Sequence, residues 1–344
     1  MAPLAPRLDN PWVGEFELLA RLRERLPAAA PPVVVGVGDD AAVSVPEGAT
    51  ATSVDAIVDG VHFRRGDVPL ALIGRKGLAT ALSDLAAMGA APGEAYVLLA
   101  VPEDLDEDDC LELLDGIEEV ARETGTALVG GDVTRSPVLS LGFTVVGHAA
   151  DASHLVTRGG AEPGDALLLT GEIGGAAAGL LLQEQPGLAD GLPAPLAEAL
   201  RSRLRDPTPR LAEGRALAAG GAHAMIDLSD GLGADAGHVA RESGVKLAIE
   251  AAALPIAAGV AEVAAAAGED PVALAAGGGE DYELLACVPA DRLVEATRAI
   301  EAMGTSATVI GAVERGTGAE IRLDDGRALK PAGFDQLSWR RRRP

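Results

Sequence analysis

Hydrophobic and polar positions along the chain follow two periods in turn, one typical of β-strands and the other of amphipathic helices. In the first 150 residues, short apolar runs alternate with longer segments that repeat every three to four residues. The expected strands are 33–37, 50–54, 95–101, 126–130 and 139–147, and the expected helices are 70–89 and 107–124. This alternation predicts a domain that contains both helices and a sheet.

A second set of strands and helices follows a polar connector at 149–165, which contains Gly and Pro. We therefore expect an N-terminal domain over 1–150, a C-terminal domain over 151–337 and a basic tail over 338–344. The expected strands of the second domain are 166–170, 224–227, 245–250, 282–288 and 306–313. The expected helices are 174–184, 208–219, 231–243, 257–267 and 290–303, with a surface loop at 185–195.

The composition fits two domains with a substantial core, because 48% of the 344 residues are hydrophobic. The two cysteines, Cys110 and Cys287, are far apart, so neither a disulfide framework nor a CxxC zinc site is expected. We find no secretion signal, and no apolar run approaches the roughly 18 residues of a membrane span. The net charge of −24 argues against a nucleic-acid partner. We expect a cytoplasmic protein with neither a membrane nor a nucleic acid as partner.

Acidic residues recur where the expected strands end, often beside glycines that permit tight turns. They are Asp39 and Asp40 in GVGDDAAV, Asp55 in TSVDAIVDG, Asp132 in LVGGDVTRS, Asp227 and Asp230 in AMIDLSDGL, and Glu280 and Asp281 in GGGEDYELL. Asp84, in ATALSDLAAMGA, is the single acid of an otherwise small and apolar helical stretch. Any one of these acids could be a turn former or a helix cap, as Asp230 could be. The recurrence in six segments favours a shared function.

Carboxylates gathered at one edge of a sheet repel one another unless a cation lies among them. Mg²⁺ prefers oxygen ligands and binds through a few carboxylates together with substrate phosphates. The acids therefore predict a site in which aspartates hold magnesium and magnesium holds phosphate.

Two other phosphate-binding motifs do not fit. The chain contains no GxxxxGK[ST] P-loop. The segment from Gly36 to Ala41 matches G-x-G-x-x-A, but a dinucleotide site needs a helix to begin there. Pro46 and Gly48 in the following residues favour a strand and a turn instead.

A few basic and polar residues accompany the acids. Lys76, Thr80 and Asp84 are spaced four apart and share one helix face. Arg158 lies in the connector, and arginine is suited to bidentate phosphate contacts. His62 follows Asp55 by seven residues and could contact a phosphate or another part of a substrate.

Seven segments together resemble the thiamine-monophosphate kinase family of the aminoimidazole ribonucleotide synthetase superfamily. In family order they are GVGDDAAV, SVDAIVDGVHF, LSDLAAMGA, GGDVTRS, TRGGAEPGD, IDLSDGL and GGEDYEL. The resemblance implies a two-domain α/β (α+β) fold, with an N-terminal sheet domain that forms a homodimer and a C-terminal α/β domain. It implies Mg²⁺-dependent transfer of the ATP γ-phosphoryl group to thiamine monophosphate, which yields thiamine diphosphate and ADP.

The resemblance also implies three groups of site residues. The magnesium group is Asp39, Ser53, Asp55, Asp84, Asp132, Asp227 and Asp230. The ATP group is Gly131, Asp132, Arg158 and Ser229, and the substrate group is His62, Glu280 and Phe334. Two positions depart from the family pattern. Val54 replaces the usual hydroxyl before Asp55, and the looser GFDQLSW ending makes Trp339 a competitor of Phe334.

Other functions remain open from the residues alone. A selenide dikinase would carry a reactive Cys or selenocysteine near its N-terminus, whereas the first Cys here is Cys110. The hydrogenase-maturation relative ends in a functional Cys, and the purine enzyme has a different segment after its Ser-Val-Asp. A non-catalytic protein that binds nucleotide or divalent ions is the alternative from another class.

Overall fold

The computed structural model describes residues 25–26, 30–37, 41–323, 325–329 and 333. These residues form two compact units that exchange short segments. The first unit contains the described residues up to 47, together with 52–81 and 92–146, and the second contains 48–51, 82–91 and the described residues from 147 onward.

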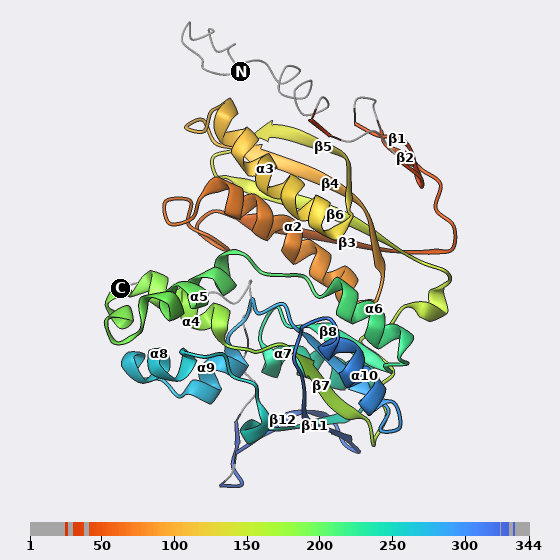
Figure 1. Ribbon diagram of the computed structural model, residues 1–344, viewed down its shortest axis with the longest axis vertical. Helices are drawn as coiled ribbons and strands as arrows, with labels where there is room; N and C mark the ends of the chain where they lie inside the picture. Colours follow the sequence, from red (N-terminus) through yellow and green to blue (C-terminus); the bar gives the residue numbers. More distant parts are fainter. Residues whose placement is uncertain (1–24, 27–29, 38–40, 324, 330–332, 334–344) are drawn as a thin grey trace, which may run out of the picture. The chain divides into compact units, whose positions relative to one another are not determined.

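The first unit is built on a four-stranded sheet with the order β3-β6-β4-β5. Its strands are β3 (Ala49–Val58), β4 (Ala91–Val101), β5 (Ala127–Arg135) and β6 (Ser140–Ala149). Helices α2 (Leu70–Ala87) and α3 (Glu107–Thr124) lie side by side over one face of this sheet (Figure 1). A separate two-stranded sheet pairs β1 (Val33–Val35) with β2 (Val43–Ser44).

Two glycines allow α2 and α3 to approach closely. A Cβ added at Gly74 would lie 1.9 Å from the Leu113 carbonyl oxygen, and one added at Gly116 would lie 1.8 Å from the Ala71 carbonyl oxygen. Any larger residue at either position would force the helices apart. The opposite face of the sheet is open in this chain, because Val54 is 74% exposed and Leu98 is 45% exposed.

The second unit is built on a seven-stranded mixed sheet with the order β13-β12-β9-β11-β7-β10-β8. Its strands are β7 (Ala166–Thr170), β8 (Ala224–Asp227), β9 (Lys246–Glu250), β10 (Leu284–Val288), β11 (Ala307–Glu314), β12 (Gly318–Arg322) and β13 (Ala328–Leu329). Its helices are α4 (Gly175–Glu184), α5 (Ala194–Arg205), α6 (Leu211–Ala219), α7 (Leu232–Ser243), α8 (Val260–Ala267), α9 (Pro271–Gly277) and α10 (Leu293–Glu301). Three 3₁₀ turns, η1 (Ala152–His154), η2 (Pro186–Gly191) and η3 (Ala251–Ala253), complete the described elements.

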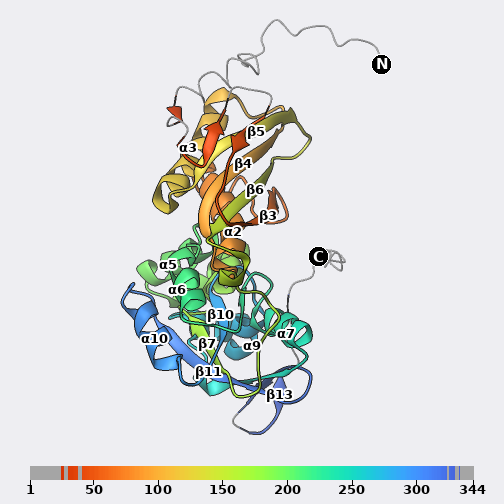
Figure 2. The same cartoon turned by 90° about the vertical axis from the view of Figure 1, so that its right-hand side faces the viewer.

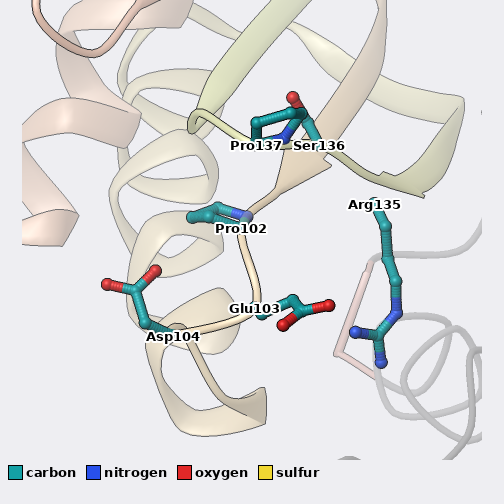
Figure 3. Close-up of a pocket in the computed structure, with 6 residues that line it drawn as sticks. All are labelled: Pro102, Glu103, Asp104, Arg135, Ser136 and Pro137. Atoms are coloured by element: carbon teal, nitrogen blue, oxygen red, sulfur yellow. The ribbon is translucent and has the colours of Figure 1, made fainter.

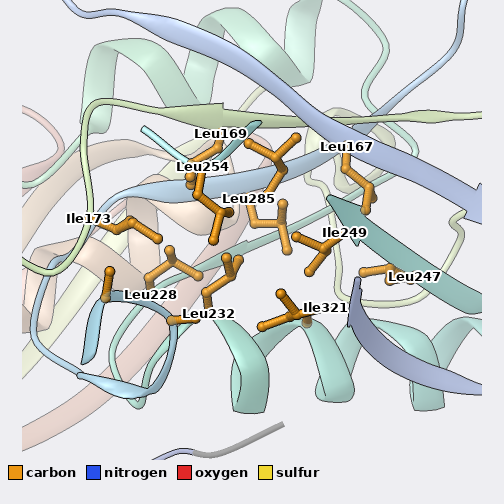
Figure 4. Close-up of a cluster of buried hydrophobic side chains, with 14 of the residues drawn as sticks. Leu167, Leu169, Ile173, Leu228, Leu232, Leu247, Ile249, Leu254, Leu285 and Ile321 are labelled. Carbon is orange, nitrogen blue, oxygen red and sulfur yellow. The ribbon is translucent and has the colours of Figure 1, made fainter. Parts of the chain in front are cut away.

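Helices cover both faces of the seven-stranded sheet, with α10 on one face and α7 and α9 on the other (Figure 2). The core on the α7 side is aliphatic. Leu167, Leu285 and Ile249 from the strands meet Leu232 of α7 in this cluster (Figure 4). The composition predicts a core of this kind, because aromatic residues make up only 2% of the chain.

Several predicted elements are confirmed, others were predicted too short, and some elements of the structure were not predicted. Helix 107–124 and strands 166–170 and 224–227 match α3, β7 and β8 residue for residue. The strands predicted at 50–54 and 126–130 were too short, because β3 runs on to Val58 and β5 to Arg135. The elements α5, α9, β2, β12 and β13 were missed.

Most neighbouring strands of the larger sheet are antiparallel. Its pairs β7–β10, β7–β11, β8–β10, β9–β11 and β12–β13 are antiparallel, and β9–β12 is parallel. In an antiparallel pair the carboxyl ends of the two strands lie at opposite ends of the sheet. No helix among the described residues is both long and apolar enough to cross a bilayer.

Candidate active site

Asp227 is the buried centre of the acidic site in the second unit. It is the last residue of β8, at the edge of the sheet, and its side chain is 3% exposed. The hydroxyl of Ser83, which is fully buried, donates a hydrogen bond of 2.7 Å to Asp227 Oδ2. Burial and then the charge of Asp84 raise the pKa of Asp227 to about 6, although the Ser83 bond and the charge of Arg158 act in the opposite direction.

The segment after Asp227 interlocks with the GGGEDYEL segment. Leu228 N–H donates to the Glu283 carbonyl at 2.8 Å, and Tyr282 N–H donates to the Leu228 carbonyl at 2.9 Å. Glu280 N–H donates to the Ser229 carbonyl at 2.9 Å. The pairing of β8 with β10 thus continues beyond both strands. It places Ser229, an expected ATP residue, beside Glu280, an expected substrate residue.

Asp235, in the first turn of α7, holds the loop that carries Asp230. Its Oδ2 accepts hydrogen bonds from Asp230 N–H at 3.1 Å and Gly231 N–H at 3.0 Å. Burial, followed by the charges of Asp227 and Asp230, raises the pKa of Asp235 to about 8. One turn along α7, His238 places a ring nitrogen within 4.8 Å of carboxylate oxygens of Asp230 and Asp235.

These residues could hold a divalent cation. Asp84, Asp227, Asp230 and Asp235, which we call the Asp227 cluster, lie in one unit. The charge of Asp84 raises the pKa of Asp227, and the charges of Asp227 and Asp230 raise that of Asp235. A cation among them would relieve that repulsion and favour their ionised forms. Their ligand atoms are carboxylate oxygens, which are the donors that Mg²⁺ prefers. The donor set therefore fits magnesium.

Ser53 and Asp55 belong to the first unit and lie on the helix-covered face of β3. Ile57, two residues further along the same strand, points with Phe143 toward Gly77 of α2. Because side chains alternate along a strand, Asp55 shares the face of Ile57, and Val54 points to the open face. Val54, where the resemblance led us to expect a hydroxyl, therefore lies on the open face of the sheet.

Asp132 lies on the opposite face of the sheet from Asp55. It pairs with Leu98 in the register of β4 and β5, so the two side chains point the same way. Leu98 packs beside Gly142, whose neighbour Phe143 points to the helices. β5 and β3 are also the two edge strands of the sheet. A single copy of this sheet therefore does not bring Asp55 and Asp132 together.

Gly131, an expected ATP residue, has a packing reason to be glycine. A Cβ at this position would lie 2.1 Å from the Val97 carbonyl oxygen of the adjacent strand. The close approach of β4 and β5 thus requires glycine here, whatever ligand binds nearby.

His62 is fixed in the turn after β3. Its Nδ1 accepts a hydrogen bond of 3.0 Å from Val58 N–H, which places the ring proton of the neutral form on Nε2. Lys76 Nζ, buried on α2, donates to the His62 carbonyl at 3.2 Å. Lys76 therefore supports the turn that carries His62.

A surface hollow of about 570 Å³ lies beyond the carboxyl ends of the parallel strands β4 and β5 (Figure 3). It is lined by Pro102, Glu103, Asp104, Arg135, Ser136 and Pro137. Arg135 ends β5, three residues after Asp132, whereas Gly131 and Asp132 themselves do not line the hollow.

Several predicted residues lie outside the described part of the chain, namely Asp39, Asp40, Phe334, Trp339 and the basic tail over 338–344. Sequence reasoning missed Ser83, Asp235 and His238. Ser83 directly precedes Asp84, and Asp235 and His238 are spaced i, i+3 on one helix face. These positions in the sequence are the signals that could have indicated the three residues.

Comparison with known proteins identifies the family. Two protein-family models match the chain. The family described as AIR synthase related protein, N-terminal domain, matches residues 38–149, and the family described as AIR synthase related protein, C-terminal domain, matches residues 162–324. The thiamine-monophosphate kinase of Escherichia coli K12 is 38% identical over 334 residues, which cover 94% of this chain and 98% of that protein. This chain belongs to the thiamine-monophosphate kinase family.

Solved structures of thiamine-monophosphate kinases share the fold. The crystal structure of the enzyme from Stenotrophomonas maltophilia K279a is 36% identical, with a TM-score of 0.79, and covers 91% of this chain and 96% of its own. A structure described as AaThiL complexed with AMPPCP and TMP is 29% identical, with a TM-score of 0.74, and covers 97% of this chain and 100% of its own. The predicted family and the two-domain α/β fold are both confirmed.

Proposed function

We propose that this protein transfers the γ-phosphoryl group of ATP to the phosphate of thiamine monophosphate, which yields thiamine diphosphate and ADP, and that the reaction requires Mg²⁺. The observation that carries the proposal is the Asp227 cluster beside Ser229 and Glu280 in a member of this family. The similar AaThiL structure, complexed with AMPPCP and TMP, supports the same pair of substrates.

The chemistry of the acceptor explains why the site needs carboxylates rather than a general base. The second pKa of a phosphate monoester is near 6, so its attacking oxygen is already largely ionised at neutral pH. Repulsion between the two anionic substrates forms most of the barrier, and positioning and electrostatic stabilisation lower it. Bound magnesium would supply the neutralising charge.

The residues of the chain would then have separate tasks. Asp84, Asp227 and Asp230, with Asp39, Ser53, Asp55 and Asp132, would hold magnesium ions. Gly131, Asp132, Arg158 and Ser229 would bind ATP, and His62, Glu280 and Phe334 would contact thiamine monophosphate. A carboxylate such as Glu280 suits the cationic thiazolium end of that substrate, and the Arg158 guanidinium suits phosphate oxygens.

A homodimer would complete the site. Asp55 and Asp132 lie on opposite edges and opposite faces of the sheet, three strand spacings apart, or about 14 Å. The face that carries Asp132 also exposes Val54 and Leu98. We infer that two copies pair through this face, with Asp132 of one copy beside the edge strand β3 of the other, so that its carboxylate and that of Asp55 serve one magnesium site from the two sides of that edge.

The family also supports two further proposals, on the domain bounds and on the location of the protein in the cell. We place the substrate-completing domain at 151–337 and the dimer-forming domain at 1–150. Cys110 and Cys287 are free and buried, and burial is the main reason that their thiol pKa values rise to about 12, which suits a reducing, cytoplasmic location.

Product analysis tests the proposed function. The protein is incubated with ATP, MgCl₂ and thiamine monophosphate, and the thiamine compounds are separated by chromatography. We expect thiamine diphosphate with Mg²⁺ and none when EDTA is in excess. ATP consumption without thiamine diphosphate would assign the protein to another reaction of the superfamily. No nucleotide consumption with any phosphate acceptor would favour a non-catalytic binding protein.

A further inference from the structure

Two residues beside the proposed substrate site have an unusual backbone conformation. Glu280 has φ of 67° and Tyr282 has φ of 51°, and the other positive φ values among the described residues belong to glycines. The left-handed region is unfavourable for residues with a Cβ, and least favourable for bulky ones. Such conformations persist only where the surrounding structure imposes them, and they concentrate at functional sites.

Asp281, between these two residues, makes the contacts that can impose this conformation. Its Oδ2 accepts a hydrogen bond from Gly174 N–H at 2.8 Å, and its Oδ1 accepts one from Ala176 N–H at 3.3 Å. Both donors belong to the start of α4, whose N-cap, Gly174, has no side chain to accept them. Asp281 thus caps this helix from a segment more than 100 residues away in the chain.

The residues on either side are also held. Tyr282 N–H donates to Leu228, and Glu283 accepts hydrogen bonds from Arg210 Nε at 2.8 Å, Arg210 Nη2 at 2.6 Å and the Thr170 hydroxyl at 2.7 Å. On the other side, Glu280 N–H donates to Ser229. Asp281 lies between these anchors, so its bonds to α4 hold the middle of the segment.

We propose that Asp281 is a positioning residue that holds the strained backbone at Glu280, and thereby presents the Glu280 carboxylate to the cationic part of thiamine monophosphate. The inference rests on the proposed function, because Glu280 is there assigned to the acceptor. We assign Asp281 no contact with either substrate, because its carboxylate accepts hydrogen bonds from α4. Its removal should weaken binding of the acceptor and leave ATP binding unchanged.

The test separates the two substrates. In Asp281→Ala we expect the KM for thiamine monophosphate to rise about tenfold or more, which is the effect of losing one well-placed contact. The KM for ATP should stay within about twofold. Asp281→Asn retains an acceptor oxygen and should recover much of the loss. The matched control is Asp270→Ala, since Asp270 is an exposed cap that accepts from Ala273 N–H on α9, and it should leave both KM values unchanged.

A double-mutant cycle shows whether Asp281 acts through Glu280. If it does, Asp281→Ala should add little to the KM effect of Glu280→Gln. Additive effects, equal rises in both KM values, or unchanged KM values in both Asp281 variants would overturn the inference. Should Asp281→Ala fail to fold, the cycle with Asp281→Asn decides it, because the KM effect that this variant retains should vanish in the Glu280→Gln background.

Calorimetric binding of thiamine monophosphate to the same variants gives a readout that does not need turnover. The two proposals can also fail separately. A wild-type protein that makes no thiamine diphosphate defeats the proposed function. An active wild-type protein with unaltered Asp281 variants defeats only this inference.

Discussion

Ser83 Oγ lies 2.7 Å from Asp227 Oδ2, although 144 positions separate the two residues in the sequence. Ser83 comes from the short segment 82–91 that the second unit takes from the N-terminal half of the chain. The same segment carries Asp84, whose charge raises the pKa of Asp227. The exchanged segment thus brings a hydrogen-bond donor and a second carboxylate to the buried aspartate.

Replacing Ser83 with Ala should affect both stability and turnover. The change leaves a buried carboxylate oxygen with one donor fewer, so we expect the free energy of unfolding to fall by about 1–3 kcal/mol. Turnover should fall about tenfold, which corresponds to about 1.4 kcal/mol of lost transition-state stabilisation. Denaturant titration and initial rates measure the two effects. The control is Ser153→Ala, because Ser153 also donates to an aspartate, Asp151, but at an exposed site. Equal effects of the two changes would contradict the role of Ser83.

The proposed magnesium ligands give a second prediction. Asp55→Ala, Asp84→Ala and Asp132→Ala should each lower turnover by at least about a hundredfold, the scale of losing one major electrostatic stabiliser. The measurement is the initial rate at saturating Mg²⁺. Asp108→Ala, an exposed position on α3, should stay within about twofold of the wild type. Near-normal turnover in all three variants would refute the metal-site assignment.

Mixing two inactive variants tests the shared site. If Asp55 of one copy and Asp132 of the other form one site, a heterodimer of Asp55→Ala and Asp132→Ala contains one intact site and one doubly altered site. Random exchange of equal amounts then restores about a quarter of the wild-type sites. Rates are measured before and after the subunits are exchanged. The control takes each variant through the same exchange procedure by itself, which should restore no activity. No recovery after proven exchange would contradict the shared-site proposal.

Asp281 predicts a pH dependence of stability in the absence of ligands. The pKa of the Asp281 carboxyl is raised to about 7, and burial is the main cause. The hydrogen bonds from Gly174 and Ala176 lower this pKa. The charge of Glu283 raises it, and the charge of Arg203 lowers it. Between about pH 4 and 7 the folded state therefore binds more protons at Asp281 than the unfolded state does. Its contribution to stability is present at acidic pH and falls as the pH rises through this window.

The Asp281→Asn variant lacks this titration. Relative to the wild type, its free energy of unfolding should improve steadily from about pH 4 to 7 and level off above pH 7. Denaturant titrations of both proteins across this range measure the difference. A difference that is constant with pH, or that moves in the opposite direction, would show that the carboxyl pKa is not raised.

Much of the fold could be predicted from the sequence because local signals mark its elements. α3 is bounded by the capping box of Asp106 and Asp109 and by Gly125 with φ of 74°. β3 and β5 were harder, because they carry polar Asp55 and Asp132 within the strand, where an open or edge position permits them. α9, only seven residues long, gave too weak a periodic signal.

The site also contains residues that could be predicted from the sequence and residues that could not. The motifs identified Asp84, Asp227 and Asp230, which the structure brings together. Ser83 was missed because its contact joins segments far apart in the chain, and a serine in a helix has no special signal of its own. The left-handed backbone at Glu280 could not be predicted either, since the contacts around it come from segments far away in the chain, namely the segment after β8 and the start of α4.

Transfer of labelled phosphate tests the central claim most directly. The protein is incubated with Mg²⁺, thiamine monophosphate and ATP labelled in its γ-phosphoryl group, and the products are separated. We expect the label in the terminal phosphoryl group of thiamine diphosphate, in amounts equal to the ADP formed and only when Mg²⁺ is present. Label released as inorganic phosphate, or transferred to no thiamine compound while ATP is consumed, would contradict the account.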